Sequence, residues 1–129
     1  MPRPKHLVLI LAREFASNLA TPMLIADASG RLVFFNEAAE SLLGKSFAEA
    51  GEMSFEEWSE KASARTADGE LLPLERRPVW IAWNERRESH ESFTITGLDG
   101  VAREISVTAF PLFAHVDEFV GMVAIFWGA

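Results

Sequence analysis

The segment between residues 68 and 79 constrains the fold of this 129-residue chain more than any other part of it. It starts with the turn-forming pair Asp68-Gly69 and carries Pro73 and Pro78 just before an apolar run. Proline is tolerated in the first turn of a helix and breaks a helix that precedes it. The segment therefore predicts a turn and then a short helix, which begins near residue 75 or 78 and ends near Arg86.

Strand-like segments lie on both sides of this turn and helix. Residues 22–27 and 31–35 are apolar, and the turn residues between them predict a hairpin. Further along, residues 93–96 and 105–110 show the alternation of a strand with one buried face, and Pro111 is expected to end regular pairing. The segment 119–127 is apolar on both faces, which indicates a central strand.

Helical segments occupy the remaining positions. Asn36 and Gly44 are suited to begin and end a short helix over residues 37–43. A second short helix is expected to begin after Ser54, whereas residues 62–67 are small and polar and indicate a loop. The predicted class is α+β, with a five-stranded antiparallel sheet and helices on one face.

The N-terminal segment predicts an amphipathic helix over residues 6–20, which ends before Pro22. Residues 1–20 are assigned to this helix, and residues 21–129 to the main domain. Its apolar stripe is too wide to remain in water, so it either packs on its own domain or pairs with a second chain. The candidate dimer residues are Leu7, Val8, Leu11, Phe15 and Leu19.

Composition excludes several classes of function. The formal net charge of −7 argues against binding to nucleic acid or to an anionic membrane, because both need a basic surface. The chain has no cysteine, which excludes disulfides, thiolate metal sites and thiol nucleophiles, and which fits a cytoplasmic location. The apolar run at residues 7–12 is too short to span a membrane.

Several motifs in this order resemble the PAS domain family. The segment 22–39 is similar to the opening hairpin and helix of the family, and Leu72-Pro73 through Pro78-Val79 resembles its crossover helix. Residues 97–100, 109–112 and 121–125 match its later strands. The resemblance implies a PAS fold and a cytoplasmic sensing or interaction module of bacterial signal transduction, including two-component regulation. Such modules are often dimeric and act on a downstream signalling protein or a fused output domain.

The resemblance also implies a ligand pocket between the sheet and the crossover helix. The residues expected to form its wall are Phe35, Trp80, Trp83, Phe93 and Ile95. Strand register decides which of the strand residues point inward, because a slip of one residue reverses them. An empty pocket or one that holds a small apolar molecule or lipid is expected, without a metal.

Each cofactor of the family can be tested against the residues. Light-sensing flavin adducts and thioester-linked chromophores need a cysteine, which is absent. Haem-binding members usually carry a histidine on the crossover helix, where this chain has Trp80 and Trp83, with His90 just beyond. Non-covalent flavin that stacks on the two indoles is the alternative for a redox sensor. No cofactor is predicted.

Two further alternatives concern catalysis and output. A small α+β enzyme with a cone-shaped pocket could use His115 and Asp117, but sequence neighbours in a turn do not usually converge on one site. No catalytic residue is therefore predicted. The family usually leaves its last strand through an Asp-X-Thr signature, whereas here Phe126-Trp127 is followed by Gly128-Ala129. The expectation is either a piece of a longer sensor or a stand-alone module that binds a partner.

Overall fold

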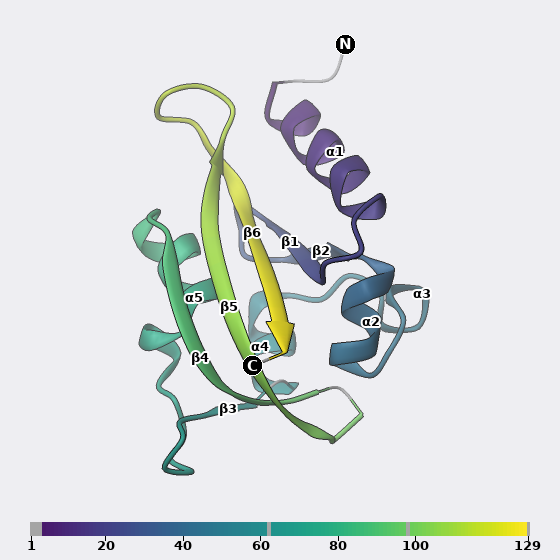
Figure 1. Cartoon of the computed structure of the whole chain (residues 1–129). Helices are drawn as coiled ribbons and strands as arrows, with labels where there is room; N and C mark the ends of the chain where they lie inside the picture. Colours follow the sequence, from purple (N-terminus) through teal and green to yellow (C-terminus); the bar gives the residue numbers. More distant parts are fainter. Residues whose placement is uncertain (1–3, 62, 98, 129) are drawn as a thin grey trace.

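A six-stranded antiparallel sheet runs through the described residues, 4–61, 63–97 and 99–128, of this computed structural model (Figure 1). The segments predicted from the sequence include a few residues that lie outside this description, namely residues 1–3, 62, 98 and 129. The strand order is β2-β1-β6-β5-β4-β3, so the first and last strands of the chain are neighbours in the middle. The strands are β1 (Met23–Asp27), β2 (Leu32–Phe35), β3 (Ser63–Arg65), β4 (Ser89–Thr96), β5 (Ala102–Phe113) and β6 (Phe119–Gly128).

The sixth strand, β3, corrects the expected count of five and the loop expected at residues 62–67. It pairs antiparallel with the edge of β4, and Ala64 lies opposite Ile95. Ala64 is buried, whereas its neighbours Ser63 and Arg65 keep contact with solvent. A three-residue strand with one buried side chain leaves almost no alternation in the sequence, which is why the pattern suggested a loop.

Strand β5 continues through Pro111, where pairing was expected to end. Its pairing with β6 extends through Pro111↔Met122 to Phe113↔Phe119. Beyond Ala109, however, β5 has a neighbour on one edge only, because its pairing with β4 ends there. A residue without an N–H is tolerated at such an edge, which explains why the proline does not end the strand.

The hairpin between β4 and β5 has the expected turn at its tip. The Gly97 N–H donates to the Val101 carbonyl at 3.0 Å, and Asp99 and Arg103 form an ion pair at 2.9 Å. The hydrogen bond from Arg103, followed by one from the Val101 N–H, lowers the pKa of Asp99 to about 2. Asp99 therefore stays ionised at the tip of this hairpin at neutral pH.

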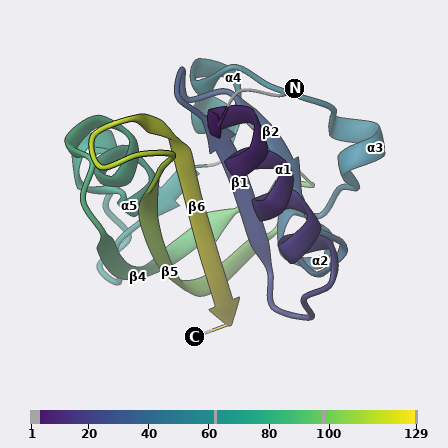
Figure 2. The same ribbon diagram turned by 90° about the horizontal axis from the view of Figure 1, so that it is seen from above.

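The two faces of the sheet are covered by different helices (Figure 2). The short helices between β2 and β4 pack on one face, called here the inner face. There they cover the larger core cluster, which includes the sheet residues Leu24, Ile105 and Phe126. They are α2 (Glu37–Leu43), α3 (Phe47–Ala50), α4 (Phe55–Lys61), the 3-10 turn η1 (Leu74–Arg76), α5 (Pro78–Trp80) and the π-helical turn η2 (Ile81–Glu85). The crossover helix is therefore the continuous unit of α5 and η2.

Helix α1 (Pro4–Ser17) lies on the outer face, across β1 and near β6 (Figure 2). Ala16 is buried there in a smaller core cluster with Ile25 and Val123. The helix ends earlier than the expected residue 20. Its last turn tightens instead, because the N–H groups of Asn18 and Leu19 donate to carbonyls three residues back, at 3.2 and 3.1 Å.

Asn36 joins these layers and is itself only 1% exposed. Its Oδ1 accepts from the Ala39 N–H at 3.0 Å, which confirms the expected helix cap, and also from the Met23 N–H at 3.1 Å. Its Nδ2 donates to the carbonyls of Ala16 and Thr21, both at 2.9 Å. One side chain thus ties the end of α1, the start of β1 and the start of α2 together.

We expect Asn36→Ala to destabilise the protein by roughly 3 kcal/mol or more, because it leaves several buried donors and acceptors without a partner. The matched control is Ser46→Ala, which removes an exposed cap of α3 and should cost about 1 kcal/mol or less. Urea unfolding followed by circular dichroism measures both free energies of unfolding. Equal losses in the two variants would contradict the role given to Asn36.

Candidate functional site

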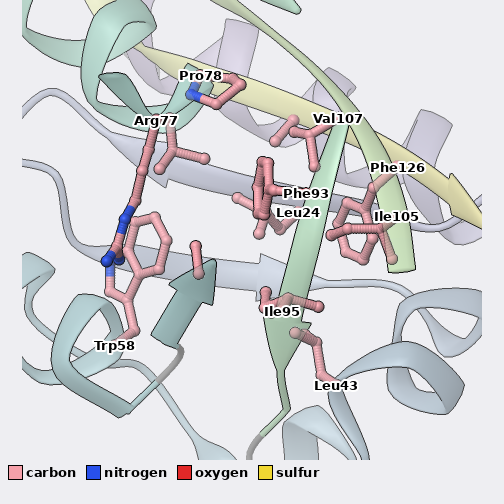
Figure 3. Close-up of a pocket in the computed structure, with 13 residues that line it drawn as sticks. Leu24, Leu43, Trp58, Arg77, Pro78, Phe93, Ile95, Ile105, Val107 and Phe126 are labelled. Carbon is pink, nitrogen blue, oxygen red and sulfur yellow. The ribbon is translucent and has the colours of Figure 1, made fainter. Parts of the chain in front are cut away.

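A cavity lies between the inner face of the sheet and the crossover helix (Figure 3). The sheet contributes side chains from all of its strands except β2, and the helical side contributes Leu43, Trp58 and the start of α5. The sheet residues are Leu24, Ala64, Phe93, Ile95, Ile105, Val107, Ala124 and Phe126, and the residues at the start of α5 are Arg77, Pro78 and Val79. The cavity therefore lies at the position where the sequence resemblance places a ligand pocket.

The volume of this cavity is about 70 Å³. Pockets for drug-sized ligands measure roughly 300–1,000 Å³, and an engineered cavity of about 150 Å³ can bind benzene. A three-ring flavin therefore does not fit unless the wall moves, and the chain lacks the cysteine of a flavin adduct. The geometry suits a neutral apolar molecule of a few heavy atoms.

Arg77 is the only charged residue in the described lining of the cavity. Its Nε donates to the Leu72 carbonyl at 3.2 Å, and Figure 3 shows its side chain alongside the ring of Trp58. Burial lowers the pKa of Arg77, and the nearby charge of Glu75 opposes that effect in part. The wall around the centre of the cavity is formed by aliphatic and aromatic side chains.

The structure places the five expected wall residues in different surroundings. Phe93 and Ile95 line the cavity from β4. Phe35 is buried and meets the ring of Phe47 edge-on, with the ring centroids 5.3 Å apart, outside the cavity lining. Of these three candidate residues, Phe93 and Ile95 border the cavity and Phe35 does not.

Trp80 and Trp83 belong to an aromatic cluster with Phe55 beside the cavity. The ring of Trp83 stacks on Phe55 at 4.6 Å and meets Trp80 at 5.5 Å. The Trp83 indole N–H donates to the Ala28 carbonyl at 3.0 Å, which fastens the crossover helix to the turn between β1 and β2. The two indoles are therefore structural contacts in this arrangement.

The same turn is fixed from a second side. The Trp58 indole N–H donates to the Gly30 carbonyl at 3.0 Å. Gly30 has φ +84°, and a Cβ there would lie 3.0 Å from the Trp83 ring. A glycine at this position therefore allows both the left-handed backbone and the close approach of the indole.

Several lining residues were missed by sequence reasoning. Ile105 and Val107 share the inner face of β5, and their alternation was visible in the sequence. Trp58 and Leu43 carried no comparable signal, because their position depends on how α4 and α2 pack on the sheet. Alternation identifies a buried face, but it does not say which buried residues border a cavity.

The histidines do not approach the cavity where they are described. His90 lies on the opposite face of β4 from Phe93, bonds Thr108 through Nδ1 at 2.8 Å and stacks on Trp127. His115 lies in the turn between β5 and β6, 4.0 Å from Glu118. Among the described residues, no group of three or more His, Cys, Asp or Glu side chains is arranged to hold a metal ion.

The candidate dimer residues of α1 lie on the side that faces away from the sheet or at its border, whereas Leu19 follows the helix and packs against the smaller core cluster. Leu7, Leu11 and Phe15 are 46%, 59% and 59% exposed, whereas Val8 and Leu19 are half-buried. The helix contacts the sheet through Leu9, Ala12 and Ala16 instead. The apolar stripe of α1 is therefore left largely uncovered within one chain.

Comparison with known proteins identifies the family. The family model described as the PAS fold matches residues 11–126, and the chain belongs to this family. No curated protein matches the chain. Within the described part of the chain, no helix has the length and apolar character needed to cross a membrane.

Solved PAS structures share this fold at low sequence identity. The PAS domain of BvgS from Bordetella pertussis is 18% identical, with a TM-score of 0.59 over 94% of this chain and 84% of that domain. That of the nitrogen regulation protein NR(II) from Vibrio parahaemolyticus is 18% identical, with a TM-score of 0.61 over 92% and 98%. The LOV domain of a blue-light activated histidine kinase from Erythrobacter litoralis is 20% identical, with a TM-score of 0.64 over 86% and 97%.

We expect Trp83→Phe to loosen the crossover helix, because phenylalanine keeps most of the stacking but cannot donate to the Ala28 carbonyl. The loss should be about 0.5–1.5 kcal/mol in the free energy of unfolding, which is the net contribution of one hydrogen bond whose acceptor remains accessible to water. The control Trp127→Phe changes an indole that is 41% exposed and should cost less. Hydrogen exchange of the amides at residues 81–85 should become faster only in Trp83→Phe. Unchanged exchange in this variant would show that the hydrogen bond to Ala28 does not hold the crossover helix.

Proposed function

We propose that this chain is a PAS sensory module that binds a small, neutral, apolar ligand in the cavity and passes the signal to a partner or a fused output domain. The observation that carries the proposal is the cavity itself, which is apolar at its centre and borders both the sheet and the crossover helix. Entry of an apolar molecule into this apolar space is favourable, because it removes apolar surface from water. Family membership and the position of the cavity support a sensory role over a catalytic one.

Helix α1 supports a second part of the proposal, which is pairing with another copy of the chain. Its uncovered stripe repeats at three- and four-residue spacing through Leu7, Leu11 and Phe15. Two such stripes are self-complementary across a two-fold axis, which is the usual symmetry of homodimers. A dimer would bury these side chains and leave the cavity in each chain intact.

We expect xenon to enter the cavity and to shift the methyl signals of Ile95 and Val107 in a ¹³C-resolved NMR spectrum of the full chain. Ala64→Leu should abolish the shifts, because the added carbons project from β3 into the cavity. The control Ser63→Leu changes the neighbouring residue, whose side chain points to the opposite face of the strand. Methyl signals that do not shift when xenon is added to the wild type would exclude the cavity as a ligand site.

We expect the wild type to be a dimer by light scattering and Leu11→Asp to shift it to monomer. The loss of two buried leucines should raise the dimer Kd by about a hundredfold or more. The control Ser17→Asp adds the same charge to α1 outside the stripe and should leave the dimer in place. A monomeric wild type would refute pairing through α1 and leave the cavity proposal standing.

A further inference from the structure

The C-terminal end of the crossover helix departs from regular α-helical geometry. After one α-helical turn, residues Ile81–Glu85 wind as a π-helix, and Arg86 then takes a left-handed conformation with φ 56° and ψ 41°. Within the described ranges, Arg86 is the only residue other than glycine with a positive φ. Both features are unfavourable for the backbone, and π-helical turns occur frequently at functional sites.

The side chain of Arg86 contacts the start of β6. Its guanidinium carbon lies 4.6 Å from the ring centroid of Phe119, within the range of a cation–π interaction. The Phe119 ring in turn meets Phe113 edge-on, with centroids 6.1 Å apart. Phe119 begins β6 and Phe113 ends β5, so the contact links the crossover helix to the β5–β6 hairpin.

The other end of the same helix forms part of the cavity wall. Pro78 and Val79 line the cavity, and Ile81 and Ala82 follow them as buried residues of the π-helical turn. A ligand larger than about 70 Å³ must displace part of the wall. The cavity residues of β4, β5 and β6 lie on strands paired with their neighbours, whereas the crossover helix spans only eight residues. We therefore take the helix to be the part of the wall that yields.

We propose that the contact between Arg86 and Phe119 is a latch that opens when a ligand larger than the resting cavity displaces the crossover helix. This inference rests on the proposed ligand site. Rewinding of the π-helical turn to an α-helical one changes the rotation of every residue after it, so Arg86 leaves the ring of Phe119. Opening uncovers Phe119 beside Phe113, which is already 40% exposed, and so changes the surface that the hairpin presents.

The test compares a probe that fits the resting cavity with one that exceeds it, namely xenon and benzene, on the full chain. NMR follows the Nε–H signal of Arg86, which the ring current of Phe119 shifts while the latch is closed. We expect benzene to move this signal and xenon to leave it unchanged, although both shift the methyl signal of Val107. Benzene that occupies the cavity without moving the Arg86 signal would overturn the latch.

Variants give a second, independent measurement. Phe119→Leu and Arg86→Met both remove the cation–π contact, so benzene no longer has to break it, and its affinity should rise roughly two- to fivefold. The matched control Arg87→Met changes the neighbouring arginine, which pairs with Glu85, and should leave the affinity unchanged. Equal benzene affinity in all four proteins would refute the latch but not the ligand site. If neither xenon nor benzene binds the wild type, the ligand site fails and the latch fails with it.

Discussion

The hydrogen bonds of Asn36 are the constraint on which the other parts of the structure depend. This buried amide accepts from Met23 and Ala39 and donates to Ala16 and Thr21, so it sets where α1 ends, where β1 begins and how α2 leaves β2. In an apolar interior these groups have no water to bind, so the arrangement of all three elements must satisfy them together. These bonds thereby help to place α1 on the outer face of the sheet and α2 on the inner face.

The cavity follows from the same arrangement. With the faces of the sheet fixed, Leu24, Ile105 and Phe126 all face the helices that connect β2 to β4. These helices are short, and their contacts with the sheet are made by large side chains of uneven shape. Tight packing is achieved around Trp83 and Phe55, and a gap of about 70 Å³ remains near the start of α5. The proposed ligand site is thus the part of the core that the crossover helix does not fill.

Much of the fold could be predicted, because it rests on local rules. The cap residue Asn36, the turn at Gly30 and the alternation of Phe93 and Ile95 each act within a few residues of the chain. The positions of Trp80 and Trp83 could not be predicted in this way. Their direction depends on the rotation of the crossover helix about its axis, and the π-helical turn changes that rotation without a clear signal in the sequence.

The sequence by itself determined the order of most elements, though not β3, together with the family and the absence of thiol chemistry, because turns, caps and alternation are properties of neighbouring residues. It also determined that the first helix has a wide apolar surface. Only the tertiary structure decided which part of that surface meets the sheet, through Leu9, Ala12 and Ala16, and which part remains uncovered. It likewise decided the size of the cavity, since a volume between elements depends on the packing of side chains that are far apart in the chain.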